Sequence, residues 1–162
     1  MSLEDKFVEA MGQFPGTVTA ITTVKDGAPL GFIATAVCSL STEPPSLIVC
    51  VNRQVSAHDA LLERGAFGVN VLSCSHTSLV QQFIQRTGSE RFKGIEWVAA
   101  SSGAPLIGDA RIAMDCSIAA VYDGYSHSIV IGNVQSVDFI DDHADSSLLW
   151  QARGFRRAIE LV

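Results

Sequence analysis

Residues 33–41 carry side chains whose small size suits close contact with a ligand. The stretch reads "IATAVCSLS" and has the pattern of a buried strand. A strand that only filled a core would carry larger branched or aromatic side chains, because these cover more of the pleated surface. Small side chains leave room beside the backbone, so we expect something other than core side chains to lie there. The residues that open this room are Ala34, Thr35, Ala36, Ser39 and Ser41.

A second segment, "NRQVSAH" at residues 52–58, joins the end of an apolar strand to the start of a helix. The unpaired N–H groups and the dipole at a helix N-terminus attract anions. Because Arg53, Ser56 and His58 surround this N-terminus, the segment is a candidate binding site for a phosphate. Two interpretations stay open, since Ser56 is also an ordinary N-cap residue and Arg53 an ordinary solvated charge. Asp59 opposes the phosphate interpretation, because it adds negative charge to the first turn.

His127 is a candidate for contact with a flat ligand. It lies where the turn-forming residues 123–126 become a strand, and a histidine in such a place is commonly a surface residue. The alternative is a ring at the mouth of a barrel, and this residue alone does not decide between the two. The chain contains neither Gly-x-Gly-x-x-Gly nor Gly-x-x-x-x-Gly-Lys-Ser/Thr. A nucleotide would therefore have to be held without either of these glycine-rich cradles.

The four cysteines indicate neither a metal site nor a catalytic thiol. They lie far apart, with no Cys-x-x-Cys pair and no spacing typical of zinc sites. We predict no metal and interpret the cysteines as small buried hydrophobic residues. Cys74 and His76 make a poor nucleophile and base, since no third group orients them. The cysteines are Cys38, Cys50, Cys74 and Cys116.

Composition and charge argue against two classes of partner. The chain has 162 residues, of which 48% are hydrophobic, enough for a single domain over residues 1–162 with its own core. The formal net charge of −6 argues against nucleic acid, because such binding depends on clustered Lys and Arg. No apolar run reaches the ~20 residues that span a membrane. The N-terminal residues also lack the pattern of a signal peptide, so we expect a cytoplasmic protein without membrane contact.

Apolar periodicity predicts three helices and six strands. The helices cover residues 3–13, 56–65 and 75–86, with Ser56 as N-cap and Gly65 as exit of the second helix. Residues 87–108 show no period and predict a loop held by Phe92 and Trp97. The strands cover residues 17–24, 30–41, 46–52, 66–73, 110–122 and 127–140.

Turn residues predict that most of these strands are antiparallel neighbours. Residues 25–29, "KDGAP", join the first two strands as a hairpin. Asp123 and Gly124 mark the turn between the last two strands, and Gly132 predicts a bulge. Antiparallel strands with hairpin turns favour a mainly β fold, a closed or split antiparallel barrel with peripheral helices, because closure removes exposed edges. Strands and helices do not alternate regularly, which disfavours a doubly wound parallel sheet.

Seven stretches, in this order and spacing, resemble the flavin reductase-like family, whose members have an FMN-binding split barrel. The resemblance covers the chain from Phe7 to about Arg157. Proteins of this family supply reduced flavin in two-component monooxygenase systems. The stretches are "FVEAMGQFPGTVTAITTVKDGAPLGF", "CSLSTEPPSLIVCVNR", "AFGVNVLS", "RFKGIEW", "GAPLI", "HSIVIGNV" and "LLWQARGFRR".

The resemblance implies an enzyme that transfers a hydride from NADH or NADPH to FMN or FAD for use by a separate oxygenase. It also implies a Greek-key split barrel and a homodimer with its sites near the subunit interface. In that arrangement backbone amides near the flavin ring stabilise the negative charge that builds on reduction. His127 then positions the nicotinamide. The other residues implied for the flavin are Ile33, Ala34, Thr35, Ala36, Val37, Ser39 and Ser41 at the ring, Asn52, Arg53, Ser56 and His58 at the ribityl and phosphate part, and Phe83, Phe92, Arg153 and Phe155 as cover.

The chain departs from the family pattern in three places. Family members commonly carry threonine where Ile33 stands, and often Gly-Asp-His where this chain has Gly124-Tyr125-Ser126-His127. The stretch "FPGTV" exchanges the commoner order of threonine and glycine. The altered turn keeps open an alternative, a flavin-binding electron carrier or sensor with little turnover. A third hypothesis is a barrel that binds another apolar ligand or only a protein partner.

Overall fold

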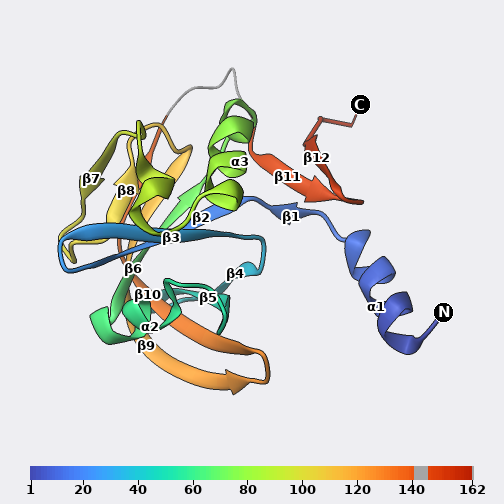
Figure 1. Ribbon diagram of the computed structural model, residues 1–162, viewed down its shortest axis with the longest axis horizontal. Coiled ribbons are helices and arrows are strands. Elements are labelled where there is room, and N and C mark those ends of the chain that lie inside the picture. Colours follow the sequence, from blue (N-terminus) through green and yellow to red (C-terminus); the bar gives the residue numbers. More distant parts are fainter. Residues whose placement is uncertain (141–145, 162) are drawn as a thin grey trace.

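Seven antiparallel strands form the main sheet of the protein. The computed structural model describes residues 1–140 and 146–161. The strand order is β3-β2-β6-β9-β10-β5-β4, which confirms the prediction of a mainly β, antiparallel fold (Figure 1). The sheet is open, with β3 and β4 as its two edges, so of the predicted closed or split barrel the closed form is wrong. The strands are β2 (Thr19–Lys25), β3 (Ala28–Ala34), β4 (Val37–Thr42), β5 (Pro45–Asn52), β6 (Ala66–Val71), β9 (Ile112–Gly124) and β10 (His127–Phe139).

The strand predicted over residues 30–41 is two strands that lie at opposite edges of this sheet. β3 pairs with β2, whereas β4 pairs with β5. Thr35 and Ala36, called the link below, connect them. The Cys50 N–H donates to the Ala36 carbonyl oxygen over 3.0 Å, so the link is fastened to β5. The sequence pattern missed this break because alternation of side chains is a local property, whereas the choice of pairing partner is not.

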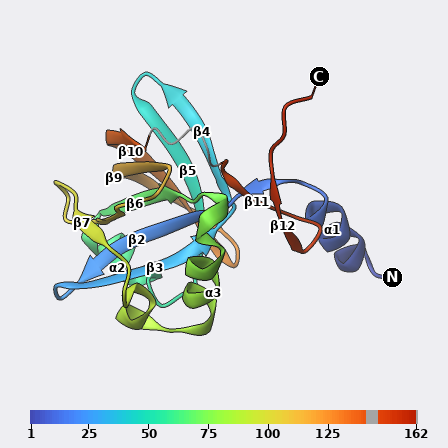
Figure 2. The same ribbon diagram turned by 90° about the horizontal axis from the view of Figure 1, so that it is seen from above.

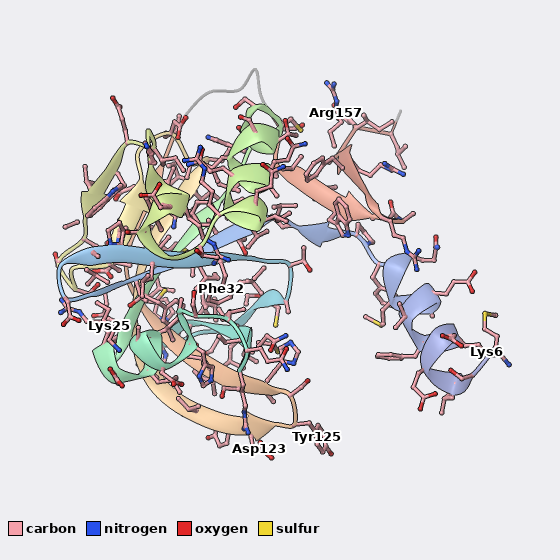
Figure 3. The ribbon with its side chains drawn as sticks, in the orientation of Figure 1. Lys6, Lys25, Phe32, Asp123, Tyr125 and Arg157 are labelled. Atoms are coloured by element: carbon pink, nitrogen blue, oxygen red, sulfur yellow. The ribbon has the colours of Figure 1, made fainter. Side chains whose placement is uncertain are left out.

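Two clusters of buried side chains make the core. One fills the inside of the curved sheet, where Phe32, Val49, Phe67 and Val130 are at most 6% exposed, and Figure 3 shows Phe32 within the body of the protein. The other lies beneath α3 (Thr77–Gln85), which covers β3 (Figures 1 and 2). Hydrophobic burial on both sides of β2 and β3 therefore holds these strands in place.

The second helix begins later than predicted. α2 spans His58–Arg64, its N-cap residue is Ala57, and no side chain caps it. Ser56 is exposed and lies outside the helix, so the predicted Ser56 cap is wrong. The predicted exit is confirmed, because Gly65 has a φ of 70°, a left-handed conformation that glycine adopts without strain.

Residues 87–108 contain more regular structure than the predicted loop. They form the 3₁₀ helix η2 (Gly88–Phe92) and a small hairpin of β7 (Trp97–Ala99) and β8 (Pro105–Ile107). Aromatic contacts hold the segment, as predicted: the Phe92 ring lies edge-on to Phe83 and to Trp97, with centroid distances of 5.1 and 6.5 Å. Short elements of this kind have too few residues to show a period.

The turn of the long β9–β10 hairpin lies later in the chain than predicted. β9 continues to Gly124, so the turn consists of Tyr125 and Ser126, and Tyr125 has a φ of 62°. The bulge is confirmed, since the β9–β10 register shifts between Ile131 and Gly132. Figure 3 shows Tyr125 at the tip of this hairpin, where its side chain is 93% exposed.

A separate group of elements, called the arm below, projects to one side of the body (Figures 1 and 2). It consists of α1 (Leu3–Gly12) and a three-stranded sheet in the order β1-β11-β12. α1 begins with a capping box between Ser2 and Asp5, and none of its residues is buried. Among the described residues, no helix has the length and apolar character needed to cross a membrane. The strands of the arm are β1 (Gly16–Thr17), β11 (Leu148–Gln151) and β12 (Gly154–Arg157).

The cysteines differ in exposure. Cys116 is buried, as predicted, whereas Cys38 is exposed, so the interpretation of all four as buried is wrong. Cys38 lies on β4, an edge strand whose outer side has no neighbouring strand in the described sheet. Cys50 and Cys74 are partly buried, and all four thiols are free.

Candidate functional site

The link presents backbone donors that the sheet does not use. Thr35 and Ala36 are both exposed, and their N–H groups donate to no backbone acceptor among the residues that the structure describes. The link's carbonyl groups are used, because Val37 N–H donates to Thr35 and Cys50 N–H to Ala36, each over 3.0 Å. Backbone N–H groups are strong, obligatory donors. The link therefore offers two donors to a ligand, and its short side chains allow that ligand to approach.

Two grooves border the link. The first, of about 240 Å³, includes Thr35 and the two residues before the link and is mostly apolar. Its aromatic wall is the pair Trp150 and Phe155, whose rings meet edge to face at a centroid distance of 5.3 Å. A flat ring held against the link would therefore meet apolar surface and little water. The lining residues are Val18, Ile33, Ala34, Thr35, Val80, Ile84, Trp150 and Phe155.

The second groove, of about 400 Å³, includes the residues just after the link. β4 contributes Val37, Ser39 and Ser41 to one side of it. Apolar side chains of the inner strands, among them Val71 and Met114, also line it, together with hydroxyl residues such as Thr19 and Ser46. The residues predicted over 33–41 are thus divided between two grooves, because the chain changes sheet edge in their midst.

Pairing of β5 with β10 brings the second predicted segment to His127. Asn52 lies directly opposite His127 in this pairing. The Arg53 N–H donates to the Ser126 carbonyl oxygen over 3.1 Å, and the Arg53 guanidinium forms an ion pair with Asp123. The His127 Nδ1 lies 2.9 Å from the Ser126 hydroxyl. Asn52, Arg53 and His127 are therefore neighbours at the turn end of the β9–β10 hairpin.

The ring of His58 is engaged within the protein. His58 is 8% exposed, its Nδ1 lies 2.7 Å from an Asp59 carboxylate oxygen, and its Nε2 lies 2.9 Å from the Ser128 hydroxyl. The order acid, histidine, serine is that of a nucleophilic triad. Ser128, however, is only 4% exposed, which leaves no room for a substrate carbonyl at its oxygen. The array instead fastens α2 to β10 beside His127, and no ring nitrogen of His58 is free for a phosphate.

Three of the predicted cover residues lie elsewhere. Phe83 and Phe92 are 2% and 4% exposed, lie in the core beneath α3, and do not line either groove. Arg153 lies in the turn between β11 and β12, with a φ of 58°, and borders a different cavity against α1. Phe155 alone of this group lines the first groove.

Sequence reasoning missed two residues of this region. Trp150 lines the first groove beside Phe155, and Asp123 binds Arg53. A signal for Trp150 was present, because it stands five residues before Phe155 in the same short stretch, "LLWQARGF". Asp123 gave no such signal, since a turn aspartate is common in any hairpin.

Comparison with known proteins identifies the family of the chain. The model of the flavin reductase like domain matches residues 11–158. A protein of Rhizobium rhizogenes named FMN reductase (NADH) RutF 2 is 38% identical, over 83% of this chain and 78% of its own length. The structure of nitrilotriacetate monooxygenase component B from Mycobacterium thermoresistibile has a TM-score of 0.91 and 29% identity, covering 96% of this chain and 87% of that one. The structure of the NADH:FAD oxidoreductase SgcE6 of Streptomyces globisporus has a TM-score of 0.89 and 28% identity, covering 98% and 95%. A match of the family model over nearly the whole length, together with a relative this similar, shows that the chain belongs to the flavin reductase like domain family.

Proposed function

We propose that this protein is a flavin reductase that transfers a hydride from NADH to FMN or FAD. The relative from Rhizobium rhizogenes is named for FMN and NADH, and the structure from Streptomyces globisporus for NADH and FAD. The observation in this chain that best supports the proposal is the pair of unused N–H donors at the link, between two largely apolar grooves. We propose that the open, curved sheet of this chain is the split barrel of the family.

The residues at the link fit a flavin. When bound, the flavin supplies a ring that accepts a hydride. The N–H groups of Thr35 and Ala36 would donate to the polar edge of that ring and stabilise the negative charge that builds there. Trp150 and Phe155 would exclude water from its apolar side. Preorganised backbone donors need no rearrangement during the reaction, so they favour the reduced form at little cost.

The hairpin end supplies groups for the rest of the cofactor and for the nicotinamide. Cys50 is the residue that is hydrogen-bonded to the link. Asn52 and Arg53 lie within three residues beyond it, and three residues of extended strand span about 10 Å. We assign them and the exposed Ser56 to the ribityl and phosphate part. His127 is a positioning residue for the nicotinamide ring, so hydride transfer depends on proximity and orientation and not on a nucleophile. NADPH is the alternative donor.

The arm supports a homodimer. An isolated helix shorter than ~12–15 residues is marginal in water, yet α1 has 10 residues and buries none of them. Its apolar side chains include Phe7, which is 63% exposed, and Met11, which is 45% exposed. Near the second groove, which Val137 lines, Phe139 is also 73% exposed. We propose that a second copy of the chain covers these surfaces, as large exposed apolar patches indicate an interaction site.

Rapid mixing tests the proposed reaction. Protein loaded with FMN in the absence of oxygen is mixed with NADH, and the loss of the oxidised flavin absorbance is followed. Bleaching is expected, and steady oxidation of NADH should require added FMN if reduced flavin leaves for a separate oxygenase. A bound flavin that is reduced only once, without turnover, would favour the electron carrier or sensor. A flavin that stays oxidised with saturating NADH and NADPH would contradict both the reductase and its alternative donor.

A further inference from the structure

The Arg53 guanidinium, which would bind an anionic ligand, is already paired with the carboxylate of Asp123. Asp123 is the residue next to the end of β9, and Figure 3 shows it at the hairpin end near Tyr125. Its side chain forms the ion pair with Arg53 already described, in which the Arg53 Nη2 donates a hydrogen bond to the Asp123 Oδ1. The Arg53 main chain is held separately, through its N–H to Ser126. The side chain of Arg53 can therefore change partner while its backbone stays in place.

The pair is exposed enough to exchange. The side chains of Arg53 and Asp123 are 46% and 73% exposed, and an exposed ion pair contributes only ~0.2–1 kcal/mol. A phosphate group carries more negative charge than a carboxylate and accepts parallel hydrogen bonds from a guanidinium. A phosphate can displace Asp123, but it must first break this contact. The other carboxylate nearby, Asp59, is engaged by His58 and does not reach Arg53 in the described contacts.

We propose that Asp123 competes with the flavin phosphate for Arg53 and so weakens phosphate-dependent binding of the flavin. This inference rests on the proposed function, because it assumes that Arg53 contacts the phosphate. A weakened phosphate contact suits a flavin that must leave after each reduction, whereas a permanently bound cofactor gains nothing from it. Asp123 is thus a residue that sets how tightly the flavin is held, through Arg53, without contact with the reacting ring.

A comparison of FMN with riboflavin isolates the phosphate. Riboflavin carries the same ring and ribityl chain but no phosphate, so any effect through Arg53 should appear with FMN only. Dissociation constants are measured for both by quenching of flavin fluorescence, in D123N and in the unchanged protein. D123N should bind FMN about 1.4- to fivefold more tightly, the factor to which ~0.2–1 kcal/mol for an exposed ion pair corresponds, and should bind riboflavin unchanged. The difference should shrink at ~1 M salt, where charges are screened within ~3 Å.

Two further variants complete the test. D26N makes the same chemical change at an exposed aspartate in the β2–β3 turn, so it controls for the change in net charge. R53Q should lower the affinity for FMN, and D123N should have no effect when added to R53Q. The inference is overturned if D123N tightens the binding of FMN and riboflavin equally, or tightens neither. It is also overturned if D26N tightens the binding of FMN as much as D123N does. Each of these results would leave flavin binding itself established. Absence of binding of either flavin by the unchanged protein would overturn the proposed function itself.

Discussion

Replacing Gly16 by alanine should weaken flavin binding, because the link packs against this glycine. A Cβ atom added at Gly16 would lie 2.7 Å from the Thr35 Cβ and 3.2 Å from its Cγ2. Carbon atoms in contact normally lie ~3.5 Å or more apart. The Thr35 Cβ is fixed to the backbone and cannot rotate away, so either the link or β1 must shift by roughly 0.8 Å, the difference between these separations.

That shift is large compared with the tolerance of a hydrogen bond. A donor moved by roughly 0.8 Å from an N···O distance of ~2.9 Å reaches ~3.7 Å, where the bond is lost. Each lost bond costs ~0.5–1.5 kcal/mol. If the N–H groups of Thr35 and Ala36 hold the flavin ring, loss of one of them corresponds to weakening of up to about tenfold, since 1.4 kcal/mol is tenfold in a dissociation constant.

Titration of flavin fluorescence measures this effect, and it should be equal for FMN and riboflavin because the ring is shared. Gly12→Ala is the matched control, since a Cβ at Gly12 on the same arm meets no atom within 4 Å. Thr35→Gly added to Gly16→Ala removes the clashing Cβ and should restore part of the affinity. If Gly16→Ala leaves both dissociation constants within a factor of two while the protein stays folded, the link does not hold the ring as we infer.

Three other substitutions test the packing around the site. Ser128→Ala leaves the buried Nε2 of His58 without its partner and should lower the free energy of unfolding by ~1–3 kcal/mol in urea titrations; an unchanged midpoint would show that the contact has no net value. Gly132→Ala places a Cβ 2.5 Å from the Phe67 ring and should cost ~1–3 kcal/mol by the same measurement, whereas a neutral effect would contradict the close packing of Phe67 against Gly132. Burial, followed by the neighbouring negative charge, raises the pKa of the Cys116 thiol from 9.0 to about 12. The thiol then stabilises the folded state fully below pH 9.0, and this contribution is lost as the pH rises toward 12; the slope in that range should be smaller in Cys116→Ala, and an equal slope would refute the assignment.

The parts of the fold that depend on local patterns were predictable from the sequence. The β2–β3 hairpin follows from its turn residues, and the bulge at Gly132 from a glycine within a strand pattern. The edge change at Thr35 and Ala36 was not, because one strand pattern runs through both sides of it. The arm was also missed in part, since β11 and β12 have four residues each and pair mainly with each other and with β1.

The site was predictable in its residue types and less so in its contacts. Asn52 and His127 end and begin their strands, and antiparallel pairing then sets them opposite each other. The hydrogen bond between the His58 ring and Ser128 joins residues that are 70 positions apart in the sequence, so no local pattern predicts it. The same holds for Asp123, whose partner Arg53 is equally distant along the chain. Side-chain pairs of this kind need the register of the sheet before they can be assigned.

The open edge of the sheet and the proposed chemistry have one physical origin. In a closed sheet every interior N–H donates to a neighbouring strand, and a ligand finds no backbone donor. Because the chain passes from β3 to β4 at opposite edges, Thr35 and Ala36 belong to neither ladder. Water can satisfy their exposed N–H groups in the free protein, so the break costs little stability. Larger side chains at these positions would cover the donors and fill the grooves, which is why a strand-like stretch here carries alanine and threonine in place of isoleucine and phenylalanine.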